Sequence, residues 1–224
     1  MEEKDYFEQL EDGKTVEKYK VGGIIVENII NGILNNVKPQ ETLNKLYEIG
    51  YNLYNIEINK YFNKKKLVNG KGIAFPLSLS LNNVAGYYIN KKSNTILKEG
   101  DILKIELGVH IDGYPSVTCI TKLVTNDKTK CDKNKLKLID ALNEAKREAL
   151  KLIKPESSNI KLVKKMEYIA NKYGLNLLTC NGKNEKAPGV ISYQMSQNVI
   201  DGKNDDDDDN LHKLILLRWN ETFD

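Results

Sequence analysis

A strand that turns back on itself is the feature that most restricts how this chain can fold. Residues 102–111 read ILKIELGVHI, a long and mostly apolar run that predicts a strand. Asp112-Gly113 follows directly and is a strong signal for a two-residue hairpin turn. A returning strand is therefore expected over about residues 114–124, and the sequence predicts an antiparallel sheet.

Helical and strand patterns surround this hairpin on both sides. Apolar side chains recur at helical spacing over residues 15–34, 41–58, 136–153 and 159–173, and alternating leucines over residues 77–81 predict a half-buried strand. Residues 175–179 and 189–200 read as further strand-like stretches. The order α, α, β, α, α, β predicts an α+β fold of packed layers.

Composition excludes several classes of protein. The chain has 224 residues with 34 Lys and Arg against 31 Asp and Glu, so its formal charge of +3 does not mark a nucleic-acid binder, and any such signal must be local. Three widely spaced cysteines exclude a disulfide scaffold. The acidic first residues do not read as a signal peptide, and no apolar run approaches the roughly 20 residues of a membrane span. We expect a protein of the cytosol or nucleus.

Glu106 is the residue in the predicted hairpin that most invites a chemical role, because a carboxylate in an apolar strand is costly without a partner. It reads either as a metal ligand or general base, or as a solvent-facing charge paired with Lys104 or a neighbouring strand. Its partner across the hairpin is Cys119 if the loop has two residues, and Val117 if the loop has four. His110 shares its face but lies roughly 13 Å away, too far to bind the same metal.

Basic segments carry a local signal for phosphate binding. Five lysines with interleaved aromatic residues and no acidic residue mark the first segment: Lys60, Lys64, Lys65, Lys66 and Lys71. Residues 122–165 hold an excess of about seven positive charges. The alternative interpretation is that both segments are solvated surface in a chain whose composition is biased toward lysine. Residues 203–210 read as an acidic low-complexity loop rather than a cation site.

Several motifs together resemble one known family. They are KGIAFPLSLSLNN at residues 71–83, LKEGDILKIELGVHIDGY at 97–114, EKYKVGGIIVENII at 17–30, ALNEAKREALKLIKP at 141–155 and SYQMSQNVIDGK at 192–203. They resemble the methionine aminopeptidase superfamily, and most closely its proliferation-associated, ribosome- and receptor-binding branch. The resemblance implies a pita-bread (creatinase/aminopeptidase-like) fold in a single domain over residues 1–224. Residues 1–130 would be one of two related halves, and residues 131–224 an incomplete second half.

The resemblance also implies where a dimetal centre would lie. The positions of metal-binding side chains in the active enzymes correspond here to Tyr87, Glu106, Val117 and, in the second half, Tyr193. Only Glu106 keeps a carboxylate, and a dimetal site needs several convergent ligands. We therefore expect a pseudoenzyme with no catalytic residues, no bound metal and no cofactor.

The function that the resemblance implies is binding. Proteins of this branch bind ribosomes and structured RNA and move between cytoplasm and nucleolus, and residues 64–66 align with a lysine-rich segment linked to that activity. We expect ribosome or rRNA contact, protein partners, no membrane, and a cytoplasmic and nuclear location. Two alternatives stay open: a residual methionine aminopeptidase that uses Glu106, and a histone- or peptide-binding chaperone module.

Overall fold

The computed structural model describes residues 13–154, 159–175 and 195–200. It divides the chain into two compact units, one holding the described residues up to Cys131 with Ser196–Ile200, the other beginning at Asp132. Three of the sequence predictions fall on residues outside the described ranges. They are Tyr193, the strand expected at 175–179 after its first residue, and the acidic loop at 203–210.

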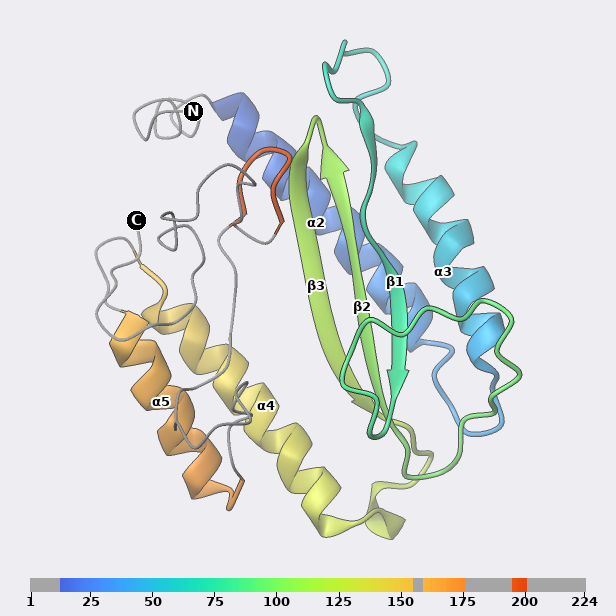
Figure 1. The fold of residues 1–224 in the computed structure, drawn as a ribbon, viewed down its shortest axis with the longest axis vertical. Coiled ribbons are helices and arrows are strands. Elements are labelled where there is room, and N and C mark those ends of the chain that lie inside the picture. The colour runs from blue at the N-terminus through green and yellow to red at the C-terminus, as the bar shows by residue number, and fades with distance from the viewer. Residues whose placement is uncertain (1–12, 155–158, 176–194, 201–224) are drawn as a thin grey trace, which may run out of the picture. The chain divides into compact units, whose positions relative to one another are not determined.

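The first unit contains a three-stranded antiparallel sheet (Figure 1). Its strands are β1 (Lys71–Leu81), β2 (Ile102–Ile111) and β3 (Tyr114–Leu123), with β2 in the middle. Ile111 pairs with Tyr114, so the turn between β2 and β3 has the two residues expected from the sequence. Asp112 and Gly113 have φ of 56° and 83°, the left-handed pair that a twisted hairpin favours.

Two helices, α2 (Gly13–Leu34) and α3 (Leu43–Ile58), cover one face of this sheet (Figure 1). Both agree with the predicted helices, and α3 begins where the Thr42 side chain accepts a hydrogen bond from the Lys45 amide at 3.2 Å. The fully buried core between helices and sheet is aliphatic and aromatic; its members include Ile25, Ile29, Ile33, Leu46, Tyr47, Leu77, Leu79, Ile105 and Leu107.

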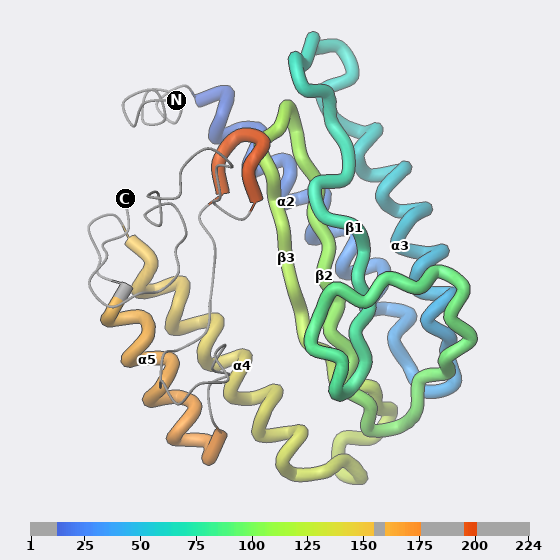
Figure 2. The backbone as a smooth tube through the Cα atoms, in the orientation of Figure 1, coloured from blue at the N-terminus to red at the C-terminus, as the bar shows by residue number. Residues whose placement is uncertain are grey.

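The end of β1 differs from the sequence expectation. The alternating leucines predict one solvent-facing side, but Ser78 and Ser80 are each only 1% exposed. The loop of residues 82–101 passes over this end of the strand (Figure 2), where the Leu79 amide donates to the Tyr88 carbonyl and the Tyr88 amide to Ser80 Oγ. This end of β1 is thus covered on both faces.

The second unit contains the helical pair α4 (Lys133–Leu152) and α5 (Asn159–Lys172), as predicted. Its small core comprises Ala141, Leu162, Val163, Met166 and Ile169. Lys172 pairs with Glu144 at 2.8 Å across the two helices. Gly174, at φ 68°, ends α5. No helix in the described ranges has both the length and the hydropathy that crossing a membrane requires.

The first unit also contains two short elements. The 3-10 turn η1 (Lys128–Lys130) follows β3 in the first unit. The strand expected over residues 189–200 is not formed by its described part, since Ser196 and Val199 make an isolated bridge around a tight turn. Asn198, at φ 63°, reverses the chain there and prevents an extended conformation.

Gly50 tests the contact between the helices and β1. A Cβ at this position of α3 would clash with Leu77 Cδ2 and lie 3.1 Å from Ile33 Cδ1. Because both neighbours are fully buried, we expect Gly50→Ala to lower the free energy of unfolding by about 1–3 kcal/mol in urea denaturation.

Gly23 provides the matched control in α2. A Cβ there meets nothing within 4 Å, so Gly23→Ala should raise the free energy of unfolding by about 0.5–1 kcal/mol through helix propensity alone. Equal effects at Gly50 and Gly23 would contradict the close packing described here.

Candidate functional site

Glu106 lies in the middle of the sheet, on the face turned away from α2 and α3. It pairs with Ser78 of β1 and with Cys119 of β3. The two-residue loop is therefore the correct alternative, and Val117 pairs instead with Gly108. The neighbours of Glu106 across the ladder are thus a hydroxyl and a thiol, neither of them a carboxylate or an imidazole.

The electrostatic surroundings of Glu106 are poor in partners. Burial raises the pKa of its carboxyl above the ordinary value. The pair with Lys104, one of the alternatives left open by the sequence, does not form, since the Lys104 ammonium donates to the Asn82 carbonyl at 2.7 Å. Within the described part of the chain, no donor makes a hydrogen bond to the Glu106 carboxylate. Atoms packed around Cys119, followed by the charge of Glu106, raise the pKa of that thiol to about 11.

Phe75 lies beside two of the positions aligned with metal ligands, Tyr87 and Val117, although the Tyr87 residue is 67% exposed. The rings of Tyr87 and Phe75 have centroids 5.7 Å apart. A Cβ at Gly108 would come within 2.7 Å of Val117 and 3.1 Å of Phe75, so apolar atoms fill this part of the face. No group of three His, Cys, Asp or Glu side chains that could hold a metal occurs among the described residues.

The five lysines predicted to bind RNA do not form one free cluster. Lys60 and Lys65 make ion pairs with Glu57 at 2.5 Å and with Glu17 at 3.1 Å. The Lys71 ammonium donates to the Tyr61 carbonyl and to Asn63 Oδ1, which ties the segment back on itself. Lys64 and Lys66 are exposed and make no hydrogen bond or ion pair to a described residue. The cations most available for an external phosphate are therefore Lys64 and Lys66.

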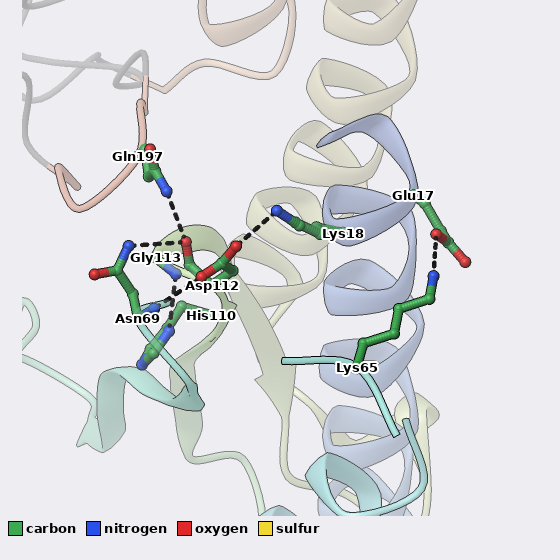
Figure 3. A network of polar contacts seen from close by, with 8 residues as sticks. All are labelled: Glu17, Lys18, Lys65, Asn69, His110, Asp112, Gly113 and Gln197. Atoms are coloured by element: carbon green, nitrogen blue, oxygen red, sulfur yellow. Dashed lines mark hydrogen bonds and ion pairs between the residues drawn. The ribbon is translucent and has the colours of Figure 1, made fainter. Parts of the chain in front are cut away.

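Asp112 anchors this segment to the hairpin (Figure 3). Its carboxylate accepts the Asn69 amide at 2.8 Å and the Lys18 ammonium at 2.7 Å, and its carbonyl accepts Gln197 Nε2 at 3.0 Å. Burial alone would raise the pKa of Asp112, but the Asn69 amide and the Lys18 charge outweigh it and hold the pKa below its ordinary value.

Sequence reasoning identified Asp112 only as a turn residue. Lys18 lies 94 positions away and Gln197 85 positions away, and no spacing rule joins such residues. His110 also belongs to this turn, because its Nδ1 accepts the Gly113 amide at 3.3 Å. Burial lowers the pKa of His110, which favours the neutral ring that such an acceptor needs.

Most of this chain is similar in sequence to known proteins. The chain matches the model of metallopeptidase family M24 over residues 17–204. It is 31% identical to proliferation-associated protein A of Dictyostelium discoideum over 198 residues, covering 88% of this chain and 49% of that protein. It is 33% identical to the curved DNA-binding protein of Schizosaccharomyces pombe over 201 residues, covering 87% of this chain and 49% of that protein.

A solved structure gives the same picture of the fold. The structure of a thermophilic Arx1 superimposes with a TM-score of 0.69 at 22% identity, covering 85% of this chain and 55% of that one. The chain spans about half the length of the curated relatives it matches.

Asp112→Asn tests the anchor. Asparagine tolerates the left-handed turn and still accepts the Asn69 amide, but it leaves the Lys18 ammonium, 18% exposed, without its counter-charge. We expect a loss of about 2–3 kcal/mol in the free energy of unfolding near pH 7. Because the folded pKa of Asp112 is lowered, this stabilisation is present above the unfolded pKa of about 3.9 and is lost as the pH falls through the folded pKa.

Glu48→Gln is the control, since it makes the same change at an exposed pair. Lys45 and Glu48 approach to 3.5 Å with both side chains more than half exposed. Its effect on stability should stay below about 0.5 kcal/mol. A pH-independent loss in Asp112→Asn, or one no larger than that of Glu48→Gln, would show that the anchor is not electrostatic.

Proposed function

This chain belongs to metallopeptidase family M24, and from that membership we propose that it is a non-catalytic member that binds ribosomes or structured RNA, together with protein partners. The expected M24-type pita-bread fold and the resemblance to the proliferation-associated branch are both confirmed by the relatives and the solved structure. The activity, the partners and the cytoplasmic and nuclear location of the whole protein remain part of the proposal.

The loss of catalysis is supported by the face around Glu106. Peptide hydrolysis in this family depends on a pair of metal ions that activates a water molecule. A cation pair needs several convergent donors, whereas two of the aligned positions hold Tyr87, whose ring lies beside Phe75, and Val117, whose side chain has no ligand atom. The observation that carries the proposal is this filling of ligand positions by an aromatic ring and a valine.

The binding role is supported by the basic segment of residues 60–71. Lys64 and Lys66 project from a loop anchored to a rigid hairpin by Asp112. Exposed lysines on a fixed loop can neutralise phosphates and release counterions. Among the relatives, one is named as a DNA-binding protein and one as proliferation-associated, which is consistent with a macromolecular partner.

Residual methionine aminopeptidase activity is the second candidate, because the half-buried Glu106 retains a carboxylate with a raised pKa. We further propose that residues 1–224 act as one aminopeptidase-like domain, with residues 1–130 as its first half and residues 131–224 as part of its second.

In the non-catalytic proposal, a degenerate metal site would lie at the positions Tyr87, Glu106, Val117 and Tyr193.

Metal content and ribosome binding in one sample separate the two candidates. From a native lysate, the chain should co-sediment with ribosomes. After purification it should hold far fewer than the roughly two transition-metal ions of an active dimetal centre and leave a methionine-led peptide uncleaved. Two bound ions together with cleavage, abolished in Glu106→Gln, would establish the enzyme instead.

Charge reversal at Lys64 and Lys66 tests the binding surface. The double variant Lys64→Glu/Lys66→Glu should weaken rRNA binding about tenfold or more and reduce the slope of log affinity against log salt by up to about two. Fluorescence anisotropy over a salt series measures both quantities. Lys92→Glu/Lys98→Glu carries the same charge change on the loop of residues 82–101 and should leave affinity and slope nearly unchanged. Equal losses in both double variants would exclude a local surface.

A further inference from the structure

A hollow of about 360 Å³ opens between the start of α2 and the basic segment. Its described lining combines lysines, aromatic rings and a single carboxylate: Glu17, Val21, Lys60, Tyr61, Phe62, Asn63, Lys64 and Lys65. This volume lies within the range of about 300–1,000 Å³ typical of small-molecule sites. We call it the basic hollow.

We infer that the basic hollow binds one unpaired RNA base and its phosphates, and that it prefers guanine. This inference rests on the proposed RNA-binding function and assigns to it a base-reading subsite. The argument has three parts: a ring for stacking, cations for phosphates and a carboxylate that selects the base.

Phe62 supplies the stacking surface. Its φ of 55° places a bulky side chain in the left-handed region, where such residues are rare and strained. Strain of this kind persists where the surroundings fix the conformation, and it concentrates at functional sites. Here Phe62 and Tyr61 are held against the aliphatic core while part of their surface stays open. A base stacked on an aromatic ring gains affinity whatever its sequence.

Lys65 covers this ring in the ligand-free chain. Its ammonium lies 5.1 Å from the Phe62 centroid and 3.1 Å from Glu17 Oε2, the contact drawn in Figure 3. Both partners of the ion pair are half exposed, at 60% and 50%, and pairs this exposed contribute little to stability. A phosphate can therefore draw Lys65 away, which frees the ring and the Glu17 carboxylate together. Lys64 adds a second cation at the rim.

Glu17 determines which base fits. An ionised carboxylate only accepts hydrogen bonds. Guanine alone among the four RNA bases presents two adjacent N–H donors on its Watson–Crick edge, and both oxygens of a carboxylate can engage them. Adenine and cytosine present a donor beside an acceptor, and uracil places its donor between two acceptors. The acceptor pair of Glu17 thus favours guanine.

The experiment compares two labelled pentaribonucleotides, AAGAA and AAAAA, by fluorescence anisotropy with the full chain. We expect AAGAA to bind about tenfold more tightly, as for one good bidentate contact. Phe62→Leu, which keeps an apolar side chain without a stacking face, should weaken both RNAs about tenfold. Tyr168→Leu is the control, because Lys165 lies 5.5 Å from that exposed ring in the second unit, in a similar geometry. It should change neither affinity.

Glu17→Gln distinguishes recognition of the guanine base from attraction of phosphates by charge alone. If the hollow only attracts phosphates, removal of an acidic group tightens both RNAs and leaves their ratio unchanged. If Glu17 reads guanine, the tenfold preference for AAGAA falls to near equality. The double variant Lys64→Glu/Lys66→Glu should weaken both RNAs while the preference remains.

Several results would overturn the inference. They are equal binding of AAGAA and AAAAA, no effect of Phe62→Leu, an unchanged ratio in Glu17→Gln, or binding of polyglutamate as tight as that of RNA. No binding of either RNA would also exclude the subsite, even if the chain co-sediments with ribosomes through another surface. Preference for AAGAA without co-sedimentation would keep the subsite and refute the ribosome proposal.

Discussion

The two-residue turn at Asp112 and Gly113 determines the register between β2 and β3. Since strand side chains alternate between faces, a loop longer by one residue would move every inward side chain of β3 to the other face. The observed turn brings Cys119 opposite Glu106 and Val117 opposite Gly108. The chemistry available beside Glu106 therefore follows from the left-handed conformation of two adjacent residues.

The same turn contains a buried carboxylate, Asp112, that holds distant segments together. Asp112 is only 8% exposed, and the donors to its carboxylate come from α2 and from the loop before β1. A buried carboxylate is tolerated where such donors satisfy it. Glu106 is the contrasting case, because burial raises its pKa and no described residue donates to it. One carboxylate is thus held by donors from distant segments, while the other lies half-buried without a described donor.

Local patterns were sufficient for the helices and the hairpin of this fold but not for its long-range contacts. The helices and the hairpin follow from apolar periodicity and the Asp-Gly turn, both of which act within a few residues. The burial of Ser78 and Ser80 could not be predicted, because it depends on a loop that packs over β1 from later in the chain. Likewise, residue type identified the lysines of the basic segment, but only the structure shows that Lys65 pairs with Glu17, while Lys64 makes no ion pair with any described residue.

The anchoring of Asn69 and Gly70 has a consequence for how this family can diversify. The Asn69 amide donates to the Asp112 carboxylate and the Asp112 amide to the Gly70 carbonyl, so the chain re-enters the sheet at a fixed point whatever precedes it. Tyr61, Phe62 and Leu67 pack against the core, but residues 63–66 between them can be lengthened, shortened or replaced while β1 keeps its place, since loops tolerate insertion where their ends are held. The bonds at Asp112 make this stretch a site where new recognition sequences can evolve at little cost to the scaffold.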